Sequence, residues 1–262
     1  MKLQRPEPIP VEEFFNEFVL EFGGELVSNL MPQNTNLPRN ADYLFRKDLV
    51  VCELKCLEKD LFNNDDDVER LMSLIQNWTS SGKITGHKAL RWVLGQEKLN
   101  KECYADMIKL ARRTTETAIR SAKHQIQSTK DYFKLPKAKG LLLIANDGNY
   151  FLEHLDFYRL ILKIMIDNFM DSSIDGFVHF SANMPVTIPN EKREMNVWIP
   201  GYRKENDNTL VNFVNKLGEK WNNFYLEKIG EEVTPPTQFD NLEEAVDTLE
   251  AMKLIREYRS RK

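Results

Sequence analysis

An acidic residue and a Glu-x-Lys triplet lie close together in the sequence, and their types and spacing suit phosphodiester hydrolysis. Asp42 belongs to one strand candidate, and Glu53 and Lys55 belong to the next. Successive side chains of a strand point to opposite faces, so Glu53 and Lys55 share one face. Burying either charge without a partner is costly, and we therefore expect Asp42 to complete a cluster of two carboxylates and one ammonium.

Such a cluster offers the ligands that Mg²⁺ or Mn²⁺ prefers. Mg²⁺ is typically held by one or two carboxylates together with several waters, and the backbone carbonyl of Leu54 is a further candidate ligand. The cation would polarise a scissile phosphate and lower the pKa of a bound water. Lys55 would orient that water or stabilise the developing charge. A Glu-x-Lys triplet is also common as a solvated ion pair at a strand edge, and that interpretation stays open.

The helices and strands expected around these residues indicate an α/β domain. A helix is expected over 11–22, because its phenylalanines recur at helical spacing and Gly23-Gly24 follows as a helix end. Further strands are expected at 25–31, 40–45, 49–57, 140–145, 174–182 and 195–199, and further helices at 68–78, 86–99, 102–133, 151–170, 210–229 and 240–259. This order predicts a central mixed β-sheet flanked by helices. We expect one domain over 1–262, with a helical insertion at about 58–100 and a C-terminal helical region at about 205–262.

The segments Asn40-Ala41-Asp42-Tyr43-Leu44-Phe45 and Val50-Val51-Cys52-Glu53-Leu54-Lys55 resemble the PD-(D/E)XK, or restriction-endonuclease-like, nuclease superfamily. The resemblance implies a restriction-endonuclease-like core, with Asp42 and Glu53 as metal ligands and Lys55 as the catalytic lysine. Many members also place a glutamate on the first helix. Among Glu12, Glu13, Glu17 and Glu21, Glu13 fits best by spacing and Glu17 competes with it. Two features depart from the pattern: Ala41 replaces the signature proline, and a helical insertion follows the motif strand.

The charge of the chain is uneven. Its net charge is −4, yet the segment 101–139 carries +6 and the remainder −10. An acidic protein with one basic segment is compatible with a local phosphate-binding face. We expect Arg112, Arg113, Arg120 and Lys123 to bind nucleic acid, although a solvated helix face is an equal alternative. Gln125 on the same helix either reaches the site, as polar residues of this helix do in some relatives, or lies at the surface.

Several other classes of protein are disfavoured. No apolar run reaches the roughly 18–20 residues that span a bilayer, and the N-terminus lacks the apolar stretch of a signal peptide. Three cysteines without a close CxxC pair disfavour a disulfide framework or a zinc site. We therefore expect a cytoplasmic protein.

The function expected from these features is a metal-dependent endonuclease that acts on DNA, with Mg²⁺ or Mn²⁺ as its cofactor. The expectation of a homodimer rests on the family resemblance alone. Two alternatives remain, an RNA nuclease with the same site and a catalytically inactive binding or assembly protein that keeps the nuclease fold. Loss of metal binding despite an intact cluster would favour the second alternative.

Overall fold

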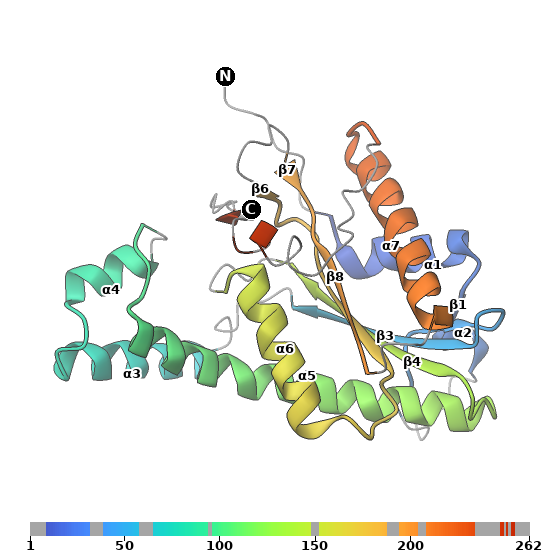
Figure 1. Ribbon diagram of the computed structural model, residues 1–262, viewed down its shortest axis with the longest axis horizontal. Coiled ribbons are helices and arrows are strands. Elements are labelled where there is room, and N and C mark those ends of the chain that lie inside the picture. The colour runs from blue at the N-terminus through green and yellow to red at the C-terminus, as the bar shows by residue number, and fades with distance from the viewer. Residues whose placement is uncertain are drawn as a thin grey trace.

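A six-stranded mixed sheet forms the centre of the computed structural model (Figure 1). The structure describes residues 9–31, 39–57, 65–93, 96–147, 152–187, 194–203, 208–233, 247–248, 250 and 253–254. The strand order is β1-β2-β3-β4-β5-β8. These strands are β1 (Glu25–Leu26), β2 (Tyr43–Phe45), β3 (Val50–Leu57), β4 (Lys139–Asn146), β5 (Gly176–Ser181) and β8 (Trp198–Tyr202). The expected α/β class with a central mixed sheet is therefore confirmed.

The three central strands run parallel, and the outer pairs are antiparallel. β4 lies between β3 and β5 and is parallel to both, whereas β1–β2, β2–β3 and β5–β8 are antiparallel pairs. Parallel neighbours need a crossover connection, which α5 (Lys101–Tyr132) supplies between β3 and β4 and α6 (His154–Asn168) supplies between β4 and β5. The register aligns Lys55 with Ile144 and Ile144 with His179, so these three side chains share one face.

Helices cover both faces of the sheet (Figure 1). α5 and α6 bury apolar side chains such as Ile126 and Ile161 against Val51 and Leu142. α1 (Val11–Phe22) and α7 (Asn208–Ile229) cover the opposite face, where Phe15 and Trp221 lie 4.7 Å apart between ring centroids. Because β4 is buried on both faces, nearly all of its residues are apolar.

The expected insertion is a helical extension made of α3 (Asp65–Ser80), α4 (Gly86–Val93) and the first turns of α5. It projects away from the sheet (Figure 1). Its own apolar contacts include Trp78 and Trp92, whose ring centroids are 6.0 Å apart. α3 begins at Asp65, three residues before the start that we expected for this helix at residue 68.

Two sequence predictions near the chain ends are wrong. The strand expected over 25–31 is only two residues long, and α2 (Val27–Leu30) follows it. The helix expected over 240–259 is contradicted at Lys253–Leu254, which form β9 and pair with β6 (Val186–Thr187). β6 also pairs with β7 (Glu194–Met195), which gives a second, three-stranded sheet. These strands are too short for a periodic pattern, so their pairing depends on partners distant in sequence.

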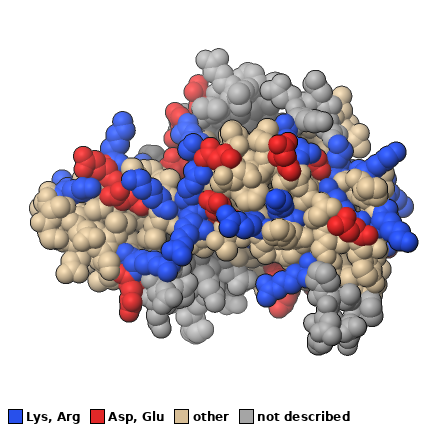
Figure 2. Space-filling view, turned by 90° about the horizontal axis from the view of Figure 1, so that it is seen from below, with Lys and Arg blue, Asp and Glu red and all other residues tan. Residues whose placement is uncertain are grey.

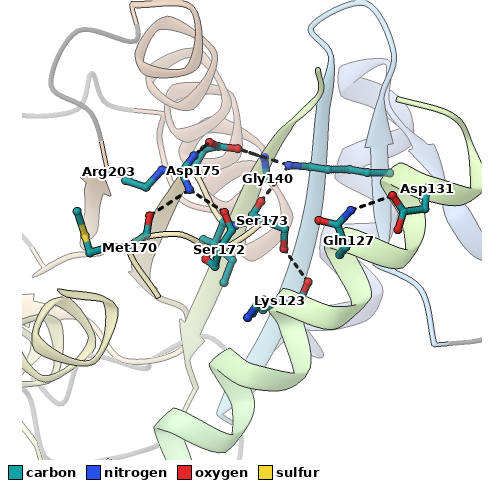
Figure 3. A network of polar contacts seen from close by, with 11 residues as sticks. Lys123, Gln127, Asp131, Gly140, Met170, Ser172, Ser173, Asp175 and Arg203 are labelled. Carbon is teal, nitrogen blue, oxygen red and sulfur yellow. Dashed lines mark hydrogen bonds and ion pairs between the residues drawn. The ribbon is translucent and has the colours of Figure 1, made fainter. Parts of the chain in front are cut away.

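A partly buried polar network around Asp175 ties α5 to the starts of β4 and β5 (Figure 3). Asp175 accepts hydrogen bonds from the backbone N–H of Gly140 at 2.9 Å and from Arg203. Lys130 donates to the carbonyl of Ser173 at 3.0 Å, and Ser173 donates to the carbonyl of Lys123 at 2.7 Å. Position 140 must be glycine, because a Cβ there would lie 2.0 Å from the Ser173 carbonyl oxygen.

Candidate active site

Asp42 is fixed to the neighbouring motif strand by a hydrogen bond from the backbone. It lies immediately before β2 rather than within a strand, and its Oδ2 accepts the N–H of Leu54 at 2.8 Å. Its own carbonyl accepts the N–H of Val27 at 2.9 Å. The backbone N–H of Leu54 therefore contacts the carboxylate of Asp42. The expected role of the Leu54 carbonyl as a metal ligand stays a prediction.

Glu53 is almost completely buried, with 1% of its surface exposed. Its Oε1 accepts a hydrogen bond from the Lys55 ammonium, which confirms that the two side chains share a face. Among the described residues, no N–H or O–H group donates to Glu53 Oε2. A buried polar atom without a partner is unfavourable and is a common mark of a functional site.

The two carboxyl groups have raised pKa values for related reasons. Burial raises the pKa of Glu53 to about 8, the charge of Asp42 adds to this increase, and Lys55 opposes it. Burial also raises the pKa of Asp42, whereas the Leu54 N–H and Lys55 lower it.

Gln125 reaches the site from the middle of α5, which decides between the two interpretations of that residue. The Lys55 ammonium donates to Gln125 Oε1 at 2.9 Å. The Gln125 amide donates to the carbonyl of Asn40 at 3.0 Å, and Ser121 donates to Gln125 Oε1 at 2.9 Å. Lys55 is thus held between Glu53 on its own strand and Gln125 on the covering helix.

Two further α5 residues hold the segment before Asp42. Thr129 Oγ1 accepts the N–H of Ala41 at 2.7 Å, and Ser128 donates to Asn40 Oδ1 at 3.0 Å. Our sequence reasoning missed both residues. The available signal was the spacing of Gln125, Ser128 and Thr129, because side chains three and four residues apart lie on one helix face.

The first helix leaves Glu12 and Glu13 both exposed, and the charge that acts on the pKa of Asp42 is that of Glu12. The charge of Glu12 raises the pKa values of Asp42 and of Tyr43. Glu13 is exposed, and Glu17 forms an ion pair with Lys228 of α7 at 2.5 Å. The role of Glu13 that the spacing suggests therefore stays a prediction.

The basic residues of α5 divide into paired and outward-facing groups. Arg112 contacts Asp167 of α6 at 2.8 Å, and Arg120 contacts Glu116 at 3.0 Å. Arg113 is exposed, and Lys123 is half-buried beside the Asp175 network. Figure 2 shows Lys and Arg side chains across this face of the molecule, interspersed with Asp and Glu.

The donor set fits a divalent cation held by a pair of carboxylates. Within the described ranges, His, Cys, Asp and Glu side chains form no group of three or more that could hold a metal ion. Asp42 and Glu53 nevertheless offer two hard oxygen ligands, one with a buried oxygen that lacks a donor. Mg²⁺ commonly needs only one or two carboxylates, because it keeps several waters.

Comparison of the chain with protein-family models, curated protein sequences and solved structures found no match. The three cysteines are free. Among the described helices, none is both long and apolar enough to cross a membrane.

Proposed function

We propose that this protein is a divalent-metal-dependent nuclease that cleaves DNA, as the resemblance to the PD-(D/E)XK superfamily implies. One observation carries the proposal. The carboxyl groups of Asp42 and Glu53 lie together in a largely buried site, and the ammonium of Lys55 contacts one of them. A buried carboxyl pair of raised pKa is a frequent feature of functional sites.

Each member of the cluster has a distinct role in this proposal. Asp42 and Glu53 hold Mg²⁺ or Mn²⁺, and the Leu54 N–H keeps Asp42 oriented toward the strand. The chemistry that the cation supplies when bound is Lewis-acid stabilisation of charge on the phosphate. The Lys55 ammonium, which contacts Glu53, stabilises negative charge on the phosphate oxygens in the transition state. Gln125 fixes the direction of Lys55.

The neighbouring helix supports a nucleic-acid substrate. α5 provides Gln125 to the site, and the same helix exposes Arg113 and Arg120. A DNA backbone bound along the exposed face of α5 would contact these cations, and contacts to phosphates supply most of the nonspecific affinity for DNA.

The test is cleavage of plasmid DNA, single-stranded DNA and RNA in the presence of Mg²⁺ or Mn²⁺. We expect metal-dependent cutting of DNA, and we expect Glu53→Gln and Lys55→Met each to reduce the rate by at least about a hundredfold, the range of a lost catalytic group. Glu25→Gln is the matched control, because Glu25 is a partly exposed residue of β1 that pairs with Arg46 away from the cluster.

The possible outcomes separate the candidate functions. Cutting of RNA alone would keep the site and change the substrate. A folded wild-type protein that binds Mn²⁺ but cuts no substrate would contradict the nuclease proposal. A protein that neither binds the metal nor cuts would favour a binding or assembly role for the fold.

A further inference from the structure

The peptide group between Asn40 and Ala41 is held on both sides by side chains of α5. The carbonyl of Asn40 accepts a hydrogen bond from the Gln125 amide at 3.0 Å, and the N–H of Ala41 donates to Thr129 Oγ1 at 2.7 Å. Gln125 and Thr129 are four residues apart, so their side chains lie on one face of the helix. We call this pair of hydrogen bonds the α5 clamp.

The Thr129 half of the clamp is shielded from water. Thr129 has no exposed surface, Ala41 is 3% exposed, and the hydrogen bond between them is buried. A buried N–H group that loses its acceptor is unfavourable, because no water replaces the lost partner. The hydroxyl of Thr129 therefore favours one orientation of the Asn40–Ala41 peptide group over all others.

The clamp also gives a physical reason for alanine at position 41. Proline has no backbone N–H, so the signature proline could not donate to Thr129 at this place. A proline ring would restrict the backbone by fixing φ. In this chain a hydrogen bond from a distant helix restricts the same segment instead.

The clamp lies directly before Asp42, whose other backbone and side-chain contacts come from the sheet side. The carbonyl of Asp42 accepts the N–H of Val27 at 2.9 Å, and Asp42 Oδ2 accepts the N–H of Leu54 at 2.8 Å. These two bonds hold the residue itself, whereas the clamp holds the chain that enters it. Without the clamp, the backbone before Asp42 could rotate and move the carboxylate relative to Glu53.

We propose that Thr129 is a positioning residue for the metal site: through the N–H of Ala41 it fixes the path of the chain into Asp42 and thereby the place of the Asp42 carboxylate. The inference rests on the proposed function, because its consequence is measured as metal affinity. The hydrogen bond that carries it is measured separately, in the protein without metal.

The test uses three variants of buried threonines in α5. Thr129→Val removes the hydroxyl and keeps the branched shape of the side chain, whereas Thr129→Ser keeps the hydroxyl. Thr115→Val is the matched control, because Thr115 is 1% exposed and its hydroxyl donates to the carbonyl of Ala111 in the same helix at 2.9 Å. Circular dichroism checks that each variant is folded.

Two measurements report on the two parts of the inference. Amide hydrogen exchange by NMR, without metal, follows Ala41 relative to Leu142 of the central strand β4, which corrects for a change in overall stability. Calorimetric titration with Mn²⁺ reports on the site. In Thr129→Val we expect Ala41 to exchange faster relative to Leu142 and Mn²⁺ to bind about tenfold more weakly, as for other residues that support metal ligands. Thr129→Ser should restore both values toward the wild type, and Thr115→Val should match the wild type in both.

Unchanged relative exchange of Ala41 in Thr129→Val would overturn the inference, and so would faster exchange with unchanged Mn²⁺ affinity. Equal weakening of Mn²⁺ binding in Thr115→Val would also overturn it, because a general loss of stability would then explain the effect. In each of these cases the wild type still binds Mn²⁺ and the proposed function stands. A wild type that binds no Mn²⁺ would contradict the proposed function and, with it, the role given to Thr129.

Discussion

At the scale of residues, the candidate site buries charged groups that each lower the stability of the fold. Together they form a cluster that could bind a metal ion and a phosphate. Glu53 is buried with one oxygen lacking a donor, although Lys55 contacts the other oxygen. Removing a carboxylate from water is compensated only by good partners. Gln125 completes the arrangement, because it accepts from Lys55 and donates to the carbonyl of Asn40. The side chain of Gln125 therefore connects the catalytic lysine of the proposal with the loop that leads to Asp42.

Gln125→Ala should lower the rate of DNA cleavage about tenfold while the protein stays folded, the effect expected of a residue that orients another. The matched control is Gln127→Ala. Gln127 lies on the exposed side of α5, where its amide donates to Asp131 at 2.8 Å (Figure 3). The measurement is cleavage under single-turnover conditions. Equal rates for Gln125→Ala and the control would show that Lys55 needs no support from α5.

At the scale of elements, a buried histidine pair joins α6 to the centre of the sheet. His154 Nδ1 of α6 lies 3.0 Å from His179 Nε2 of β5, and Phe157 packs 5.1 Å from the His179 ring. Burial lowers the pKa of His154 to about 4 and that of His179 well below its usual value. Because burial lowers both pKa values, both imidazoles are neutral at pH 7, and one donates to the other across this contact.

This pair should make the folded protein sensitive to acid. An unfolded histidine takes up a proton near pH 6.5, whereas folded His154 does so only near pH 4. Between these values the unfolded state binds more protons, so stability falls as the pH decreases from 6.5 toward 4. For His154 alone the loss at pH 5 is on the order of 2 kcal/mol.

Urea denaturation at pH 7 and pH 5 measures this effect. His179→Gln should lose less stability between the two values than the wild type does, because it has one ionisable group fewer in the core. The exposed His87 provides the control His87→Gln, which should behave as the wild type does. An unchanged pH dependence in His179→Gln would rule out the pair as its source.

At the scale of the whole molecule, DNA binding depends more on where the charges lie than on the net charge. The net charge of −4 would repel DNA, yet α5 lies within a segment of charge +6. α5 and α6 cover one face of the sheet, and α1 and α7 cover the other (Figure 1). Interactions between exposed charges decay within about 10 Å at moderate salt, so negative charges elsewhere on the molecule are largely screened from DNA bound at α5.

DNA affinity should therefore decrease with salt in a way that depends on α5. Arg113→Gln should reduce the slope of log affinity against log salt concentration by about 0.9, the value for one lost phosphate contact on duplex DNA. Fluorescence anisotropy measures this slope, in a Glu53→Gln background that prevents cutting. Lys228→Gln on α7 is the control, since Lys228 pairs with Glu17 on the opposite face. Equal slopes for all three proteins would place the DNA elsewhere.

The sequence by itself determined the local features of this protein. The helical spacing of phenylalanines defined α1 at its observed bounds, and alternation in β3 put Glu53 and Lys55 on one face. The α/β order of elements could be predicted for the same reason, because the spacing of apolar residues in a long segment indicates its type and its buried face. These features depend on residues that are near each other in the chain.

Only the tertiary structure decided which distant residues meet. Gln125 lies 70 positions from Lys55 and could equally have been a surface residue. Which glutamate of α1 faces the site depends on how α1 is rotated against the sheet, and the run of neighbouring glutamates does not reveal that rotation. The pairing of β9 with β6 and the contact of Asn183 with Ile9 join segments far apart in sequence, and packing rather than local propensity selects them.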